Sequence, residues 1–95
     1  MRLPLSFETS LTRADFLRLL PAAVGGDRFI EQGTIFRHEE QQRSWRIDFV
    51  PLPELELGRV RLDRYRLTFA FEGYADAEIA SFMARFELYF RRGGG

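Results

Sequence analysis

The sequence predicts an α+β fold in which two helices cover one face of a mostly antiparallel, four-stranded sheet as a two-layer sandwich. Three observations support this prediction. Apolar residues recur at helical spacing near the C-terminus, they alternate with polar residues along three other stretches, and short Pro- or Gly-containing segments separate these stretches. The expected order is strand, helix, three strands and a long final helix. We expect residues 1–92 to form a single domain and residues 93–95 a glycine tail.

The final helix, predicted from Asp76 to Arg92, is the strongest periodic signal in the chain. Apolar residues recur there at intervals of three and four residues, and most of them are aromatic. A stripe of such large side chains needs a broad apolar surface, which alternating strands supply. The stripe consists of Ile79, Phe82, Met83, Phe86, Tyr89 and Phe90.

The first helix is predicted to follow an N-terminal strand at residues 2–8. Thr12 can accept a hydrogen bond at the start of this helix, and Asp15 favours its positive end. Pro21 cannot continue the hydrogen-bond ladder, so the regular helix should end or kink there. One further turn can follow before Gly25 and Gly26 stop the helix.

The next strands are expected at residues 28–37 and 43–50, with a polar turn at residues 38–42. The first of them is interrupted near Gln32 and Gly33 by a bulge or a tight turn. The segment 51–53 contains two prolines and should break the second strand. Residues 54–58 would then form a loop or a short edge strand.

The last and longest strand, residues 59–72, changes the phase of its apolar residues. Val60 and Leu62 occupy even positions, whereas the apolar residues from Tyr65 onward occupy odd positions. One face can take both sets only if an extra residue is inserted. The sequence therefore predicts a β-bulge near Asp63 and Arg64.

The composition excludes several classes of function. Fourteen basic residues, all arginine, balance 14 acidic residues, so we do not expect a nucleic-acid partner or an anionic membrane surface. The absence of cysteine excludes disulfides, thiolate metal sites and thiol catalysis. No apolar run is long enough for a membrane span, and we expect a cytoplasmic protein. The exclusive use of arginine fits codon bias in a GC-rich genome, which favours a bacterial source.

No residue pattern points to catalysis, to a cofactor or to a metal. The single histidine, His38, precedes Glu39 and Glu40 on the expected polar turn, where neighbouring side chains diverge. No serine lies in a nucleophile-elbow context, and the glycines do not have the spacing of a phosphate-binding loop. We therefore expect a protein that is not an enzyme.

Two surface features favour a module that binds a protein partner or a second copy of itself. The first is a stripe of mostly small residues on the final helix, opposite the aromatic stripe. Small side chains allow another helix to approach closely, either the first helix or a symmetry mate. The alternative is an ordinary surface helix with one exposed leucine. The candidate contact residues on this stripe are Ser81, Ala84 and Leu88.

The second feature is the proline-flanked segment that contains Leu52, Leu55 and Leu57, with Glu54 and Glu56 between them. Such a segment can add a strand to a partner or clamp an apolar ligand. It can equally be a loop that closes one end of the core. Leu52, Leu55 and Leu57 complete the set of candidate partner-binding residues.

An alternative function is anion or nucleic-acid binding by an arginine-rich sheet face formed by Arg46, Arg59, Arg61 and Arg66. RNA-binding sheets also need exposed aromatic residues, and here the strand aromatics are in phase with the core. A solvated face, whose arginines pair with acids such as Asp48 and Glu72, is the simpler interpretation.

Two resemblances add further expectations. The tail Arg91-Arg92-Gly93-Gly94-Gly95 resembles the C-terminus of ubiquitin-like sulfur carriers and modifiers, but only in these last residues. It implies a carrier function as a third alternative, although the family's tail follows a strand rather than a helix. Gly93 can instead act as a simple helix stop. A long C-terminal helix on an antiparallel sheet also resembles helix-grip domains, which hold lipids or polyketides but have more strands.

Overall fold

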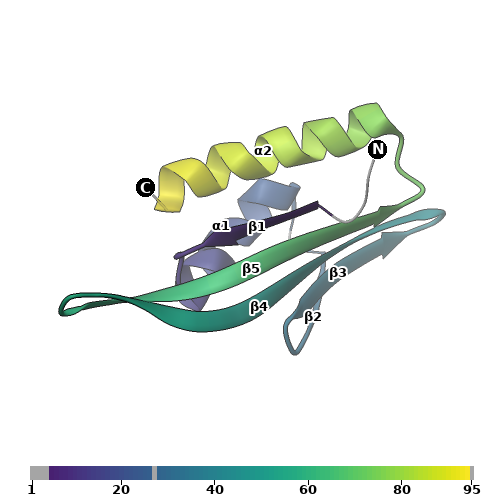
Figure 1. Cartoon of the computed structure of the whole chain (residues 1–95). Helices are drawn as coiled ribbons and strands as arrows, with labels where there is room; N and C mark the ends of the chain where they lie inside the picture. The colour runs from purple at the N-terminus through teal and green to yellow at the C-terminus, as the bar shows by residue number, and fades with distance from the viewer. Residues whose placement is uncertain (1–4, 27, 95) are drawn as a thin grey trace.

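The computed structural model of this 95-residue chain describes residues 5–26 and 28–94, with side chains through Phe90. Its strands form one antiparallel sheet in the order β1-β5-β4-β3-β2, accompanied by two helices (Figure 1). The elements are β1 (Leu5–Thr9), α1 (Arg13–Val24), β2 (Ile30–Gln32), β3 (Ile35–Glu40), β4 (Arg43–Leu57), β5 (Val60–Glu72) and α2 (Asp76–Gly94). The α+β class and the antiparallel sheet are therefore confirmed.

The sheet has five strands, whereas the sequence predicted four. The difference lies in residues 28–37, where the chain reverses and forms the hairpin of β2 and β3. Gly33 has a φ of +63°, a left-handed conformation that glycine adopts without strain in a tight turn. The interruption predicted near Gln32 and Gly33 is thus a turn.

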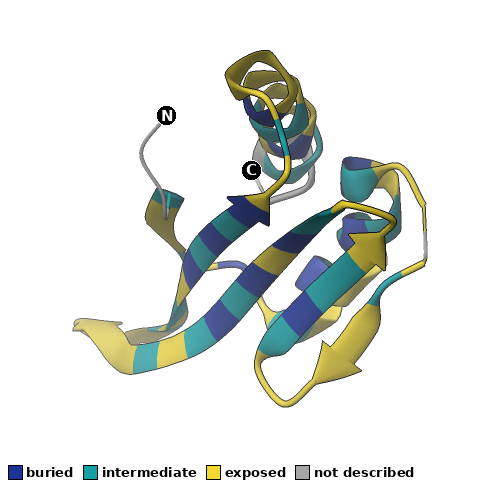
Figure 2. Ribbon diagram, turned by 90° about the vertical axis from the view of Figure 1, so that its right-hand side faces the viewer, coloured by how far each residue is buried: buried dark blue, intermediate teal, exposed yellow. Residues whose placement is uncertain are grey.

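Both helices contact the same face of the sheet. Phe49 and Phe69 point to this face, because Phe49 pairs with Leu67, two residues before Phe69 on β5. The ring of Phe16 in α1 lies 4.3 Å from that of Phe49, and the ring of Phe86 in α2 lies 4.8 Å from that of Phe69. Buried and less buried residues alternate along β4 and β5 as a consequence (Figure 2).

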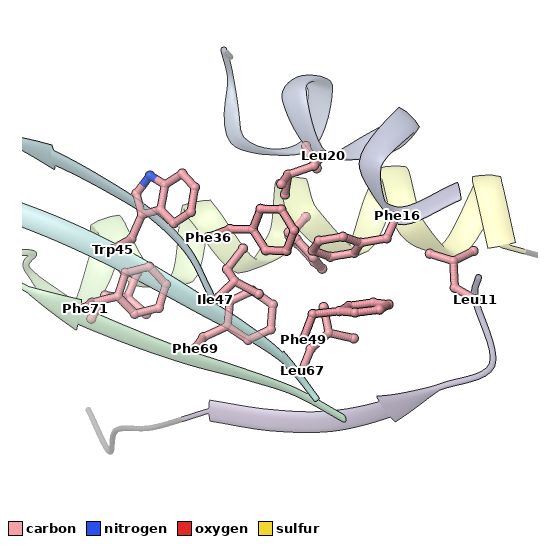
Figure 3. Close-up of a cluster of buried hydrophobic side chains, with 13 residues drawn as sticks. Leu11, Phe16, Leu20, Phe36, Trp45, Ile47, Phe49, Leu67, Phe69 and Phe71 are labelled. Atoms are coloured by element: carbon pink, nitrogen blue, oxygen red, sulfur yellow. The ribbon is translucent and has the colours of Figure 1, made fainter. Parts of the chain in front are cut away.

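The core is a continuous layer of aromatic rings between sheet and helices (Figure 3). Phe82 of α2 lies 5.0 Å from Phe71 and 5.7 Å from Trp45, measured between ring centroids. Rings therefore occupy the space in which a helix-grip domain would hold its ligand. The largest fully buried side chains are Phe16, Phe36, Phe49, Phe69, Phe86, Leu20, Ile47 and Leu67.

The helix ends follow the expected signals in part. Thr12 accepts a hydrogen bond from the backbone N–H of Asp15 at 3.2 Å, as predicted for the start of α1. Pro21 does not end α1, which continues for one turn to Val24 and stops at Gly25, where φ is +82°. At the other end of the chain, α2 includes Gly93 and Gly94, so the helix extends beyond the expected stop.

The largest correction concerns β4, which does not break at residues 51–53. It continues through Pro51 and Pro53 to Leu57, so residues 54–58 are not a loop. Only β5 pairs with this part of β4 among the described strands. The strand β3 does not pair with β4 at Pro51 or Pro53. The missing N–H of a proline on the β3 side of β4 therefore interrupts no ladder.

Candidate partner-binding surface

The outer parts of β4 and β5 form a projecting two-stranded ribbon, which we call the arm (residues 52–64). The ladder between β3 and β4 ends at Asp48, and the ladder between β1 and β5 ends at Tyr65. Beyond these points, among the described strands, β4 and β5 pair only with each other. The arm extends past both helices (Figure 1) and contributes to a longest molecular dimension of 48 Å, against 24 and 21 Å for the other two.

A β-bulge at the base of the arm sets its register. Leu52 pairs with Arg64 and Leu55 pairs with Leu62, so β4 has one more residue than β5 between these pairs. The sequence predicted a bulge on β5 near Asp63 and Arg64. The irregularity lies at this level of the hairpin, but the extra residue belongs to β4, next to Pro53.

This register gives the arm one apolar face. Leu55 lies opposite Leu62, and Leu57 lies opposite Val60, and directly opposed residues of a ladder share a face. Leu55, Leu57 and Val60 are 39%, 58% and 54% exposed. We call the surface of Leu55, Leu57, Val60 and Leu62 the apolar arm face.

The apolar arm face points away from the helices. The strand β5 alternates without a bulge of its own, so Val60 and Leu62 lie on the side opposite Tyr65 and Leu67. The phase change noted in the sequence therefore does not bring Val60 and Leu62 into the core. Sequence reasoning missed them as surface residues, although their two-residue spacing matches that of Leu55 and Leu57 across the hairpin.

The edge of β4 in the arm is poorly suited to adding a strand. The N–H of Phe49 donates to the carbonyl of Thr34 at 2.7 Å, so this position of β4 points away from β5. By strand alternation Pro51 points the same way and has no N–H to donate, and Pro53 in the bulge also lacks an N–H. The open edge of β5 carries Arg61 and Arg64, and charged edges also discourage pairing. The arm thus offers its apolar face rather than its edges.

The opposite face of the arm is polar. Glu56 pairs across the ladder with Arg61, and their side chains form an ion pair at 3.5 Å. Within the arm, Glu54 and Glu56 lie on β4, whereas Arg59 and Arg61 lie in the turn and on β5. The β4 strand of the arm therefore carries acids, whereas the turn and β5 carry arginines together with Asp63.

An ionic cluster attaches the base of the arm to β1. Glu8 accepts hydrogen bonds from Arg64 at 2.5 Å and from Arg66 at 3.4 Å. The hydrogen bond from Arg64, followed by that from Arg66, lowers the pKa of the Glu8 carboxyl below its ordinary value of 4.5. Charge-assisted hydrogen bonds of this kind orient the ribbon relative to the sheet.

The helix residues predicted to bind a partner form a second, separate surface. Leu88 is 51% exposed, and Ala84 is also exposed. Ser81 borders a groove of about 1240 Å³ that also reaches the end of α1 and β3. α1 contacts α2 through the rings of Phe16 and Phe90 and through a hydrogen bond that Arg85 donates to the carbonyl of Ala22 at 2.9 Å. Because α2 covers the other side of the sheet, this stripe and the apolar arm face lie on opposite sides of the molecule.

The arginines of the alternative anion site do not converge. Arg66 binds Glu8, and Arg61 binds Glu56. Arg46 pairs in the ladder with Ala70, which is about 30 Å along β5 from Arg61 at the usual rise of a strand. The expected pairing with Asp48 is also absent from the described contacts, since Asp48 accepts a hydrogen bond from Thr34 at 2.7 Å. Arg59 lies in the turn between β4 and β5, at the tip of the arm.

His38 lies on β3 rather than on a polar turn, because the strand continues to Glu40. Its ring is 6.0 Å from that of Trp45, and its Nδ1 contacts the backbone carbonyl of Arg28. Among the described residues, no group of three or more acidic or histidine side chains is arranged to hold a metal ion. The predicted carrier tail overlaps the last turn of α2 at Gly93 and Gly94, and Gly95 lies outside the described residues.

Comparisons of the chain with protein-family models, curated proteins and solved structures found no match. In the part of the chain that the structure describes, no helix has both the length and the apolar character to cross a membrane.

Proposed function

We propose that this chain is a non-enzymatic binding module that contacts a protein through its apolar arm face. The observation that carries the proposal is the pairing of Leu55 with Leu62 and of Leu57 with Val60 on a ribbon that projects from the core. Exposed apolar residues scattered singly are ordinary, whereas a contiguous group marks a contact surface.

The low stability expected of a projecting hairpin favours an arm whose apolar face is covered by a partner. A two-stranded hairpin without further support is marginally stable in water. None of the apolar arm face belongs to the hydrophobic core or to the side chains packed against it. Complete burial of one leucine side chain contributes about 1.5–3 kcal/mol, so a partner on this face would stabilise both the complex and the arm itself.

Site-specific photo-crosslinking tests the proposal. A photoreactive phenylalanine analogue replaces Leu57 on the apolar arm face, and a matched variant carries it at Glu56 on the polar face of the same strand. We expect a protein adduct from position 57 and a much weaker one from position 56, in the cells that make the chain. Adding Leu55→Glu should remove the adduct, because a charge on the contact face opposes its burial.

A third variant with the analogue at Leu88 compares the arm with the helix surface. Adducts at position 88 and none at position 57 would assign the contact to the stripe of Ser81, Ala84 and Leu88 instead. Equal yields at positions 56 and 57 would show that the apolar face has no special role and would overturn the proposal.

A further inference from the structure

We propose that β1 binds an extended segment of another protein, which adds to the sheet as a further strand and places its apolar side chains in a groove between β1 and α2. This site is separate from the apolar arm face and does not depend on the contact proposed there. The strand order places β1 at the edge of the sheet, and among the described strands β1 pairs with β5 alone (Figure 1). One side of its backbone is therefore open to a partner.

The first argument is the direction of the backbone groups of β1. The N–H of Phe49 points away from β5, so its ladder partner Leu67 directs its own backbone groups to β1. Phe7 lies opposite Leu67 and returns these hydrogen bonds. Its neighbours Ser6 and Glu8 consequently point to the open side, where each presents an N–H donor and a carbonyl acceptor to an added strand.

The second argument is an apolar groove that runs along the same strand. Its volume of about 600 Å³ is within the usual range of binding pockets. Phe7 is 36% exposed, although its ring lies 5.7 Å from Phe69 and 6.3 Å from Phe86, so part of the ring remains free for a ligand. Every second side chain of an added strand would enter the groove. The groove is lined by all five residues of β1 (Leu5–Thr9) and by Ala80, Met83, Glu87 and Phe90 of α2.

The third argument is that β1 lacks the features that discourage pairing at the other edges. The opposite edge strand, β2, has only three residues, and the arm carries prolines on β4 and arginines on β5. Within Leu5–Thr9 there is no proline, lysine or arginine. The one carboxylate of β1, that of Glu8, binds Arg64 and Arg66 on the sheet face that points away from the groove. The edge of β1 is thus a suitable template for strand addition.

The charge of the groove indicates the composition of the segment. On the helix side, the charged side chain among the described lining residues is the carboxylate of Glu87. It favours a segment with lysine or arginine next to its apolar residues. A second copy is less suited, because Phe86 lies 6.3 Å from Phe7, and a twofold pairing of two β1 strands about Phe7 would bring both copies of Glu87 into one contact.

A synthetic strand tests the proposal. The probe is acetyl-Lys-Val-Thr-Val-Thr-Val-Lys-amide with a fluorescent label, titrated with the chain from about 1 µM to about 1 mM and followed by anisotropy. We expect saturable binding in this range. An added strand directs the N–H groups of every second residue to β1. Of two peptides that are N-methylated either at the valines or at the threonines, one should therefore bind at least about tenfold more weakly and the other should bind like the probe.

Variants of the chain locate the site. Ser6→Pro removes a donor from the open edge without interrupting the ladder to β5, and Ala80→Arg introduces a large cation into the groove from an exposed position. Each should weaken binding at least about tenfold. Ala84→Arg, at an exposed position of α2 outside the groove, and Leu57→Glu on the arm should bind the probe like wild type. The fluorescence of Trp45, which is buried in the core, verifies that each variant is folded.

Three outcomes would overturn the inference: no binding of the probe up to about 1 mM, equal affinities of the two N-methylated peptides, or unchanged binding by both Ser6→Pro and Ala80→Arg. Wild-type dimers that Ser6→Pro abolishes would assign the edge to a second copy instead. The crosslinking at Leu57 tests the arm independently, so a failure at β1 leaves the proposed function standing, and the absence of an arm adduct leaves the β1 site standing.

Discussion

Phe86 of α2 and Phe69 of β5 meet edge to face, with ring centroids 4.8 Å apart and an interplanar angle of 86°. Both side chains are completely buried. Aromatic pairs in this geometry gain about 0.5–1.5 kcal/mol beyond the burial of their area. Since Phe69 also pairs in register with Leu5 of β1 and Ile47 of β4, this contact fixes the final helix to the centre of the sheet.

Truncation at this contact should be severe. We expect Phe86→Ala to lower the free energy of unfolding by about 3–5 kcal/mol, because it removes a buried ring and leaves a cavity. Leu88→Ala, two residues away on the exposed side of α2, should change it by less than about 0.5 kcal/mol. Urea unfolding followed by Trp45 fluorescence measures both values. A loss below about 1 kcal/mol for Phe86→Ala would contradict the burial of Phe86 against Phe69.

Two glycines with similar backbone conformations provide a matched comparison. Gly73 and Gly58 have φ values of +76° and +65°, so alanine is strained at either position. A Cβ at Gly73 would lie 2.2 Å from the carbonyl oxygen of Gln42 and 2.9 Å from the Cβ of Arg43, whereas a Cβ at Gly58 would meet nothing within 4 Å.

We therefore expect Gly58→Ala to cost about 1 kcal/mol and Gly73→Ala at least about 2 kcal/mol, measured by thermal unfolding. The extra loss at Gly73 reflects the displacement of backbone in the turn between β3 and β4. Equal losses at the two positions would mean that this turn shifts at no cost.

The parts of the fold that local patterning determines could be predicted from the sequence. Trp45, Ile47 and Phe49 alternate along a strand that is covered on one side, and their inward orientation follows from that spacing. The aromatic stripe of α2 follows equally from helical periodicity, and Phe82 and Phe86 lie on the sheet as expected.

The arm could be predicted only in part, because its shape depends on which strands lack a neighbour. Proline indicates a strand end when a strand pairs on the side to which its N–H would point, but among the described strands only β5 pairs with β4 at Pro51 and Pro53. The position of the bulge depends in turn on pairing across the hairpin, so its assignment to β5 was wrong. The sequence pattern predicts a surface position for Leu55 and Leu57 and a core position for Val60 and Leu62, whereas the register places all four on one face outside the core.

The start of α2 should be sensitive to acid. Glu78 accepts a hydrogen bond from the backbone N–H of Ala75 at 2.8 Å and another from Arg43 at 2.6 Å. The backbone hydrogen bond, followed by the charge of Arg43, lowers the pKa of Glu78 below its ordinary value of 4.5. The charged form is thus favoured by folding, and its contribution is present above the unfolded pKa and lost as pH falls through the folded pKa.

The variant Glu78→Gln retains an acceptor for Ala75 but not the charge. We expect it to be less stable than wild type at neutral pH and to approach the stability of wild type below the folded pKa. Urea unfolding at several pH values measures this difference. High salt should reduce the difference at neutral pH, because the pair with Arg43 is solvent-accessible and therefore screened. A difference that stays constant with pH would contradict a role for the charge.

The prolines of β4 should protect the chain from pairing edge to edge. The alternation established by Phe49 directs position 51 toward the open edge, where proline removes a donor that a neighbouring chain needs, and Pro53 in the bulge removes a second N–H. Pro51→Thr with Pro53→Thr restores both N–H groups on a strand with high β-propensity. We expect assemblies larger than those of wild type, detected by light scattering and by a gain of thioflavin fluorescence at high concentration. Pro21→Thr, within α1 and away from any strand edge, is the control and should not assemble. If the double variant has the same assembly state as wild type, the edge of β4 is protected by its twist or its charges rather than by its prolines.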